Sequence, residues 1–143
     1  FGFLSNIAYA QNHNNFKELQ NLQALAKEAT EKQVPIMLMF GAQWCEYCEL
    51  LNERVFEPMA LGGLYKDIVV MRHVGVDEDK PIPGFNGDLI KKAQYAYQLD
   101  ADLTPTVVFL NSQCQQVAPM IVGIQEITMF TNVIHRNLNI AYN

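Results

Sequence analysis

The chain has 143 residues, a length that corresponds to one domain with a single substantial hydrophobic core. Half of the residues are hydrophobic and 17% are charged, which is typical of globular proteins and excludes a disordered or fibrous chain. The net charge of -5, without any run of Lys or Arg, argues against nucleic acid or an anionic membrane as partner. The longest apolar stretch, residues 34–42, is about half of the roughly 20 residues that cross a bilayer, so we expect no membrane span.

The first residues carry a pattern associated with export. Ala8-Tyr9-Ala10, followed by Gln11, has the small-x-small spacing after which signal peptidase cuts. We therefore predict that residues 1–14 are an N-terminal segment with a signal-peptide remnant, the alternative being an ordinary N-terminal segment. Residues 15–143 then form the folded domain. A periplasmic or otherwise exported protein would mature where nearby cysteines are oxidised unless something reduces them.

The first half of the chain predicts two helices with a strand between them. Asn15 and Glu18 have the spacing of a capping pair, and apolar residues at helical spacing then indicate a helix over residues 15–31. Residues 36–40 are an uninterrupted apolar run, typical of a central parallel strand that is covered on both faces. Residues 45–56 return to a helical pattern.

The middle of the chain is more polar. Pro58 is expected to end the second helix, and residues 68–76 have the pattern of another buried strand. Residues 77–87 contain three acids, two prolines and two glycines, which predicts an exposed loop. Asp88 could then cap a helix that extends through residue 99, with Ala93 and Tyr97 among the residues facing inward.

The last third predicts a hairpin and a helix. Residues 106–110 form a β-branched strand, residues 111–116 a polar turn, and residues 117–122 the returning strand. Pro119 places that strand at a sheet edge, because proline cannot donate to the ladder. A last helix has Ile127, Phe130, Ile134 and Leu138 on its inner face. The order of elements supports a single α/β layered sandwich.

The segment Trp44-Cys45-Glu46-Tyr47-Cys48 carries the strongest chemical signal. Its cysteines are separated by two residues and lie where a buried strand leads into a helix. The helix N-terminus favours a thiolate on Cys45, since free backbone N–H groups and the helix dipole stabilise negative charge there. Cys48 lies one turn further on the same side, more buried, and could attack a mixed disulfide formed on Cys45. The pattern predicts dithiol–disulfide exchange.

Three other interpretations of the cysteine pair are a structural disulfide, half of a zinc site and two inert core thiols. Zinc needs about four ligands, and only Cys114, His13, His73 and His135 remain, without a second paired spacing. A bridge across so short a loop would remove little entropy from the unfolded chain. We therefore predict redox exchange that requires no metal and no organic cofactor.

Three features together resemble the thioredoxin superfamily over about residues 15–138: the apolar strand, the segment from Phe40 to Cys48, and Leu103-Thr104-Pro105-Thr106 before a hairpin. The resemblance implies a thioredoxin-like three-layer α/β/α sandwich with a mixed central sheet. Within the superfamily the chain is most similar to exported bacterial thioredoxin-like proteins, including the type associated with sulfur oxidation.

The resemblance also implies roles for residues outside the cysteine pair. Pro105 would be cis and lie against Cys45 and Cys48, and the backbone of Thr104 would bind a client peptide as an added strand. A simple turn proline is the alternative. Trp44 would be an exposed docking surface beside Cys45, or else simply a core residue.

The chain departs from the thioredoxin pattern where those proteins carry a buried carboxylate, because Met39 occupies that position. His73 lies near where the family often has a lysine and is a candidate proton acceptor, the alternative being a structural histidine. Glu46 and Tyr47, between the cysteines, are candidate modulators. The charge of Glu46 should destabilise a Cys45 thiolate and favour a reductant. Cys114, in the predicted turn, is expected to be exposed and is not assigned to catalysis.

These features predict a monomeric, exported enzyme that reduces disulfides of client proteins and is itself re-reduced by a membrane electron donor. The same dithiol could instead serve a thiol oxidase or isomerase. A non-catalytic binding module is a further alternative, distinguished by a buried and unreactive Cys45. The last alternative is an assembly factor that delivers reductant to one client, with selectivity from the loop over residues 77–87.

Overall fold

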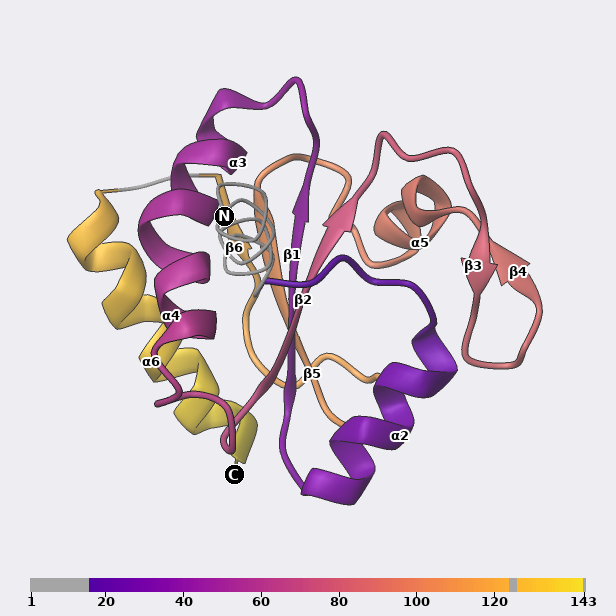
Figure 1. Cartoon of the computed structure of the whole chain (residues 1–143), viewed down its shortest axis with the longest axis horizontal. Coiled ribbons are helices and arrows are strands. Elements are labelled where there is room, and N and C mark those ends of the chain that lie inside the picture. The colour runs from indigo at the N-terminus through magenta and orange to yellow at the C-terminus, as the bar shows by residue number, and fades with distance from the viewer. Residues whose placement is uncertain (1–15, 124–125, 143) are drawn as a thin grey trace, which may run out of the picture.

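The computed structural model describes residues 16–123 and 126–142 and contains a mixed sheet between two layers of helices (Figure 1). The strand order is β2-β1-β5-β6. β1 (Ile36–Gly41) is parallel to β2 (Val70–Gly75) and antiparallel to β5 (Thr106–Leu110), and β6 (Ile121–Val122) pairs with β5 at one edge. The predicted α/β/α sandwich with a mixed central sheet is confirmed. The N-terminal segment proposed for residues 1–14 lies outside the described residues.

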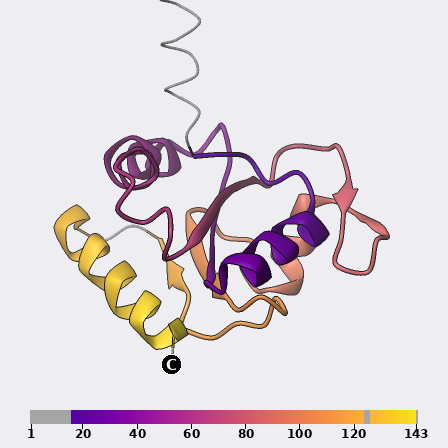
Figure 2. The same cartoon turned by 60° about the horizontal axis from the view of Figure 1, so that its bottom comes forward.

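The two faces of β1 pack into two separate hydrophobic clusters, because successive side chains of a strand point to opposite faces. Ile36, Leu38 and Phe40 join the cluster on the side of α2 (Leu22–Lys32) and α5 (Lys92–Gln98). Met37 and Met39 join the cluster that contains both cysteines of the motif and the inner face of α6 (Ile127–Tyr142). Figure 2 shows α6 and the helices that follow the motif on one side of the sheet and α2 on the other.

The first helix begins later than predicted. α2 starts after Asn21, whose side chain accepts a hydrogen bond from the Ala24 N–H at 2.9 Å. Glu18, predicted to belong to a capping pair, instead lies in an extended segment that forms a parallel bridge with His73 of β2. Backbone bonds from Leu19 N–H to His73 O and from His73 N–H to Lys17 O fix this segment beside the sheet.

The helix that follows the cysteine motif runs beyond its predicted end. It consists of α3 (Glu46–Leu51), the π-helical turn η1 (Asn52–Phe56) and α4 (Glu57–Leu61). The prediction that Pro58 ends it is wrong, since Pro58 lies in the first turn of α4. In η1 the Glu57 N–H bonds to Asn52 O, five residues back, so the ladder shifts register just before the proline.

The region predicted as an exposed loop followed by a helix contains a small hairpin instead. β3 (Ile82–Pro83) pairs with β4 (Leu89–Ile90), and Ile82 is buried in the core. Asp88 therefore belongs to the hairpin and does not cap a helix. α5 begins only at Lys92, and Tyr95 is its buried tyrosine, whereas the predicted inward residues Ala93 and Tyr97 are exposed.

The last elements agree with prediction more closely. β5 and α6 occur as expected, and Phe130, Ile134 and Leu138 of α6 are buried. β6 is only two residues long, and Pro119 precedes it. Its carbonyl accepts a hydrogen bond from the Asn137 side chain at 2.6 Å. Over residues 16–123 and 126–142, no helix is long and apolar enough to cross a membrane.

Candidate active site

Cys45 and Cys48 meet where β1 leads into the helix. Cys45 is the N-cap of α3, and its sulfur accepts a hydrogen bond from the Cys48 N–H at 3.2 Å. The two cysteines form a disulfide with their Cα atoms 5.3 Å apart. Cys45 is 7% exposed and Cys48 only 1%, so both are buried and the first cysteine is the more accessible of the two. Since Cys45 is buried, its reactivity is what separates an enzyme from a binding module. This geometry suits attack through Cys45 and resolution by Cys48.

The residues around Cys45 form an exposed rim. The side chains of Trp44 and Tyr47 are 71% and 60% exposed, so Trp44 is not a core residue. Glu46 is also exposed, in the first turn of α3. Large aromatic surfaces that face water are a feature of sites that bind other proteins.

Pro105 lies beside the motif through the register of the sheet. Phe40 pairs with Thr106, so the residue before Thr106 lies at the end of β1 from which the motif begins. The Thr104–Pro105 peptide bond is cis, and Pro105 O accepts a hydrogen bond from the Gly123 N–H at 2.8 Å. Within the described chain neither backbone group of Thr104 has a hydrogen-bond partner, so both are available to an added strand.

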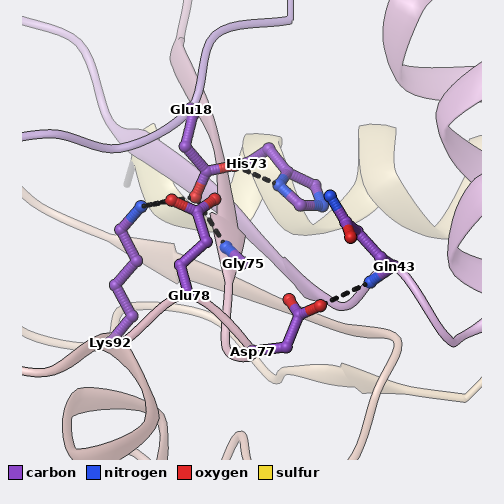
Figure 3. A network of polar contacts seen from close by, with 7 residues as sticks. All are labelled: Glu18, Gln43, His73, Gly75, Asp77, Glu78 and Lys92. Carbon is purple, nitrogen blue, oxygen red and sulfur yellow. Dashed lines mark hydrogen bonds and ion pairs between the residues drawn. The ribbon is translucent and has the colours of Figure 1, made fainter. Parts of the chain in front are cut away.

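His73 belongs to a network of polar contacts at the edge of the sheet (Figure 3). Its Nδ1 lies 2.6 Å from Glu18 Oε1. The other oxygen of Glu18 accepts hydrogen bonds from Lys92 Nζ and from the Gly75 N–H, each at 2.7 Å. Lys92 Nζ also lies 3.2 Å from Glu78 Oε1. We call these five residues the polar network.

Glu18 is held ionised by its partners. Burial raises the pKa of its carboxyl group, but hydrogen bonds from His73, Lys92 and the Gly75 N–H outweigh burial and lower the pKa from 4.5 to about 2. Lys92 is 1% exposed, so its ammonium group depends on Glu18 and Glu78 for compensation. The network therefore places fixed charges beside the sheet, on the side of His73 away from the cysteines.

The imidazole of His73 and the resolving cysteine border the same small space beside Gly41. A Cβ on Gly41 would lie 2.9 Å from His73 Nε2, 3.3 Å from Cys48 Cβ and 3.3 Å from Met39 Cε. Met39, at the position of the thioredoxin carboxylate, is fully buried and places a methyl group there. The structure thus places the His73 imidazole and Cys48 on the same side of β1, next to Gly41.

A pocket of about 370 Å³ lies on the outer side of this arrangement. Ala42, Gln43, Glu49, Asn52 and His73 line it. The Oδ1 atom of Asn52 is buried there and accepts no hydrogen bond from any described residue. Figure 3 shows the His73 ring between the Glu18 carboxylate and the Gln43 side chain.

The loop before Cys45 is held by a hydrogen bond to the loop that follows β2. The Gln43 N–H donates to Asp77 Oδ2 at 3.0 Å. Since Gln43 lies two residues before Cys45, this bond connects the start of the motif to the loop after β2. No pattern in the sequence indicated either this contact or the roles of Glu18 and Lys92 in the network.

Cys114 is separate from the motif. It is half-buried against the hydrophobic cluster on the opposite face of the sheet, contrary to the expectation that it is exposed. Burial raises the pKa of its thiol to about 12, so it is not a reactive thiolate near neutral pH. In the part of the chain that the structure describes, no three His, Cys, Asp or Glu side chains come together as metal ligands.

A family model described as a thioredoxin-like domain matches residues 22–137. The fold is also similar to that of thioredoxin O2 from Arabidopsis thaliana in its oxidized state, with 20% identity over 87% of this chain and 96% of that chain and a TM-score of 0.58. Mitochondrial thioredoxin 3 from Saccharomyces cerevisiae gives 17% identity, 90% and 97% coverage and a TM-score of 0.58. A mutant thioredoxin from Halobacterium salinarum NRC-1 is 21% identical over 85% of this chain and 88% of that chain, with a TM-score of 0.57. No curated protein sequence matches the chain.

Proposed function

The chain belongs to the family of thioredoxin-like domains, and we propose that it is a thiol–disulfide oxidoreductase that reduces disulfide bonds of client proteins. One observation carries the proposal: Cys45 is the N-cap of α3 and lies at disulfide distance from a more buried Cys48. An N-terminal position on a helix stabilises the thiolate that attacks, and burial protects the thiol that resolves.

The proposed reaction has two sulfur exchanges. The Cys45 thiolate attacks one sulfur of the client disulfide, a bond forms between Cys45 and the client, and the other client sulfur leaves as a thiolate. Cys48 then loses its proton and attacks Cys45 Sγ. The mixed disulfide breaks, and the second client thiolate leaves and takes up a proton. Two electrons pass to the client, and the protein is left with the Cys45–Cys48 disulfide.

Client binding is proposed to use the rim around the cysteines. Trp44 and Tyr47 provide exposed aromatic surface, and the unpaired backbone groups of Thr104 can accept an extended peptide as an added strand. Leu103, 67% exposed, extends this surface next to Thr104. A peptide bound there would lie across the motif with its disulfide near Cys45.

The direction of electron flow is proposed from Glu46. Its exposed carboxylate lies next to Cys45 and disfavours the thiolate, and a dithiol whose thiolate is less stabilised is the stronger reductant. Water and salt screen an exposed charge, so the effect is modest.

We further propose that the protein acts as a monomer in the periplasm or another exported compartment. The Ala8-Tyr9-Ala10 pattern supports export, and the Cys45-Glu46-Tyr47-Cys48 motif supports a relationship to exported bacterial thioredoxin-like proteins, including the type associated with sulfur oxidation. In an oxidising compartment such a reductase needs a membrane electron donor to regenerate its dithiol.

The experiment that tests the function uses two cysteine variants. Cys48→Ser should form a stable mixed disulfide with a disulfide-containing protein, because the resolving thiol is missing, whereas Cys45→Ser should form none. The Cys114→Ser variant is the matched control and should turn over like the wild type. Equal trapping by Cys45→Ser and Cys48→Ser would contradict the proposed nucleophile, and an inert wild-type pair would favour a non-catalytic binding module.

A further inference from the structure

We propose that His73 is the catalytic base that takes the proton of Cys48, and that Glu18 is the positioning residue that aims its imidazole. The inference rests on the proposed function and deepens it, since it names the group that activates the resolving thiol. Cys48 is 1% exposed among apolar side chains. Burial disfavours a thiolate there, so resolution needs a base.

The contact with Glu18 decides which nitrogen of His73 is available. Glu18 is ionised and can only accept hydrogen bonds. His73 Nδ1 lies 2.6 Å from Glu18 Oε1, so Nδ1 carries a proton and donates it to the carboxylate in a hydrogen bond. In a neutral imidazole Nε2 is then the acceptor. Lys92 and the Gly75 N–H hold the other oxygen of Glu18 and keep the carboxylate in place. Phe16 packs edge-on against the ring, with centroids 5.9 Å apart.

The acceptor nitrogen lies near the resolving cysteine. His73 Nε2 and Cys48 Cβ border the space next to Gly41, which has no side chain to separate them. Met39 closes this space with a methyl group that cannot accept a proton. Of the three groups around this space, only the His73 imidazole can accept a proton from Cys48.

The adjoining pocket connects His73 to solvent. It is bounded by His73 and by Asn52, which lies one helical turn after Cys48. In the proposed step the proton passes from Cys48 to Nε2 and then leaves His73 through this pocket to solvent.

Charged side chains from five segments of the chain lie around His73, whereas β1, which pairs with β2 beside it, contributes none. Lys17 and Glu18 lie in the extended segment before α2, and Glu78 lies in the loop after β2. The helices α3, α4 and α5 contribute Glu49, Glu57 and Lys92. Four of these six groups are carboxylates and two are ammonium groups.

The proposed step balances as follows. The S–H bond of Cys48 breaks and its proton forms an N–H bond on His73. The thiolate attacks Cys45 Sγ, the mixed disulfide breaks, and the departing client thiolate takes a proton from the imidazolium or from water. The dithiol loses two electrons and the client disulfide gains them, so no further oxidant or reductant is required.

The test separates attack from resolution in one turnover. Reduced protein is mixed with 5,5'-dithiobis(2-nitrobenzoate), and Cys45 attack and Cys48 resolution each release one coloured thiolate. His73→Gln should leave the first phase unchanged and slow the second by about 100-fold near neutral pH. The deficit should shrink as pH rises, because hydroxide can then deprotonate Cys48. Glu18→Gln should slow the same phase about tenfold, in line with an orienting role.

Two further variants guard against a purely structural explanation. His135→Gln removes the other described histidine, which contacts Tyr65 away from the motif, and should change neither phase. Gly41→Ala keeps every titratable group but places a methyl between His73 Nε2 and Cys48, and should slow the second phase as His73→Gln does. Equal slowing of both phases by His73→Gln at every pH, or a normal second phase in Gly41→Ala, would overturn the proposal. Absence of the first phase in the wild type would refute the proposed function instead.

Discussion

The cysteine motif follows β1 and the polar network surrounds the adjacent parallel strand β2, but the interactions in the two regions are of opposite kinds. Cys48 is packed among apolar side chains, with Met39 beneath it. A short distance away, Lys92 is equally inaccessible to water and is held by two carboxylates. Among the described residues, the cluster around the reacting sulfurs thus contains no buried charge, and the charges of the network lie beside β2.

This difference separates two tasks. The apolar side chains around Cys48 shield the resolving thiol from water and contribute hydrophobic stability. The polar network orients His73 and holds the segment before α2 against the sheet. Substitutions in the network should therefore lower stability and, at His73 and Glu18, also slow the resolution step, whereas substitutions on the exposed rim should act mainly on client binding and turnover. The predictions below test that division.

Lys92→Met should have the largest effect on stability. Removing the buried ammonium takes away a compensating charge from Glu18 and Glu78, and we expect a loss of about 3 kcal/mol, the low end of the range for a buried pair, because water screens the half-exposed Glu78. Urea unfolding followed by circular dichroism measures the change. Lys91→Met, at the exposed neighbouring position, is the control and should change the free energy of unfolding by less than about 0.5 kcal/mol. A loss of under about 1 kcal/mol for Lys92→Met would show that the network adds little stability.

Glu18→Gln should lower the free energy of unfolding by roughly 2 kcal/mol near neutral pH, allowing for the part of the side chain that water screens. The folded-state pKa of Glu18 lies below its ordinary value of 4.5, so its contribution is complete above pH 4.5 and disappears as pH falls through about 2. The difference between wild type and variant should shrink over that interval. A difference that is constant down to pH 2 would mean that the Glu18 charge is not what stabilises the fold.

Trp44→Ala should lower kcat/KM for a protein disulfide about tenfold, which corresponds to roughly 1.4 kcal/mol of lost contact, and leave a small-molecule disulfide unaffected. Its exposed side chain should add almost nothing to stability. Tyr97→Ala removes another exposed aromatic, on α5, and is the matched control. Equal losses with both variants would argue against a docking role for Trp44.

Cys114 should show the least reactivity toward a thiol reagent. Burial raises the pKa of its thiol to about 12, so iodoacetamide at mildly alkaline pH should label Cys45 in the reduced native protein and leave Cys114 unlabelled. Mass spectrometry of the labelled peptides measures this. Rapid labelling of Cys114 would show that the thiol is more accessible than its packing implies.

The features that could be predicted from sequence are those that depend on residues close together in the chain. β1 and α6 follow from their hydrophobic spacing, and the cysteine pair follows from its position between a strand and a helix. The exposed Trp44 could be anticipated only through family resemblance, because a single aromatic has no periodicity.

The features that could not be predicted depend on partners far apart in the chain. Glu18 contacts His73 across 55 residues and Lys92 across 74. In the sequence, Glu18 has the spacing of a capping residue, and the competing local pattern concealed its pairing with β2. The β3–β4 hairpin was missed because strands of two residues are too short to show alternation.

The reduction potential of the Cys45–Cys48 pair tests the central claim most directly. It is measured by equilibration with glutathione in the Cys114→Ser variant, which excludes cross-linking through the third cysteine. We expect a value at or below about -230 mV, at which the dithiol gives electrons to most client disulfides. A value near about -120 mV would identify an oxidant and contradict the reductase proposal, and a pair that does not exchange would contradict redox function altogether.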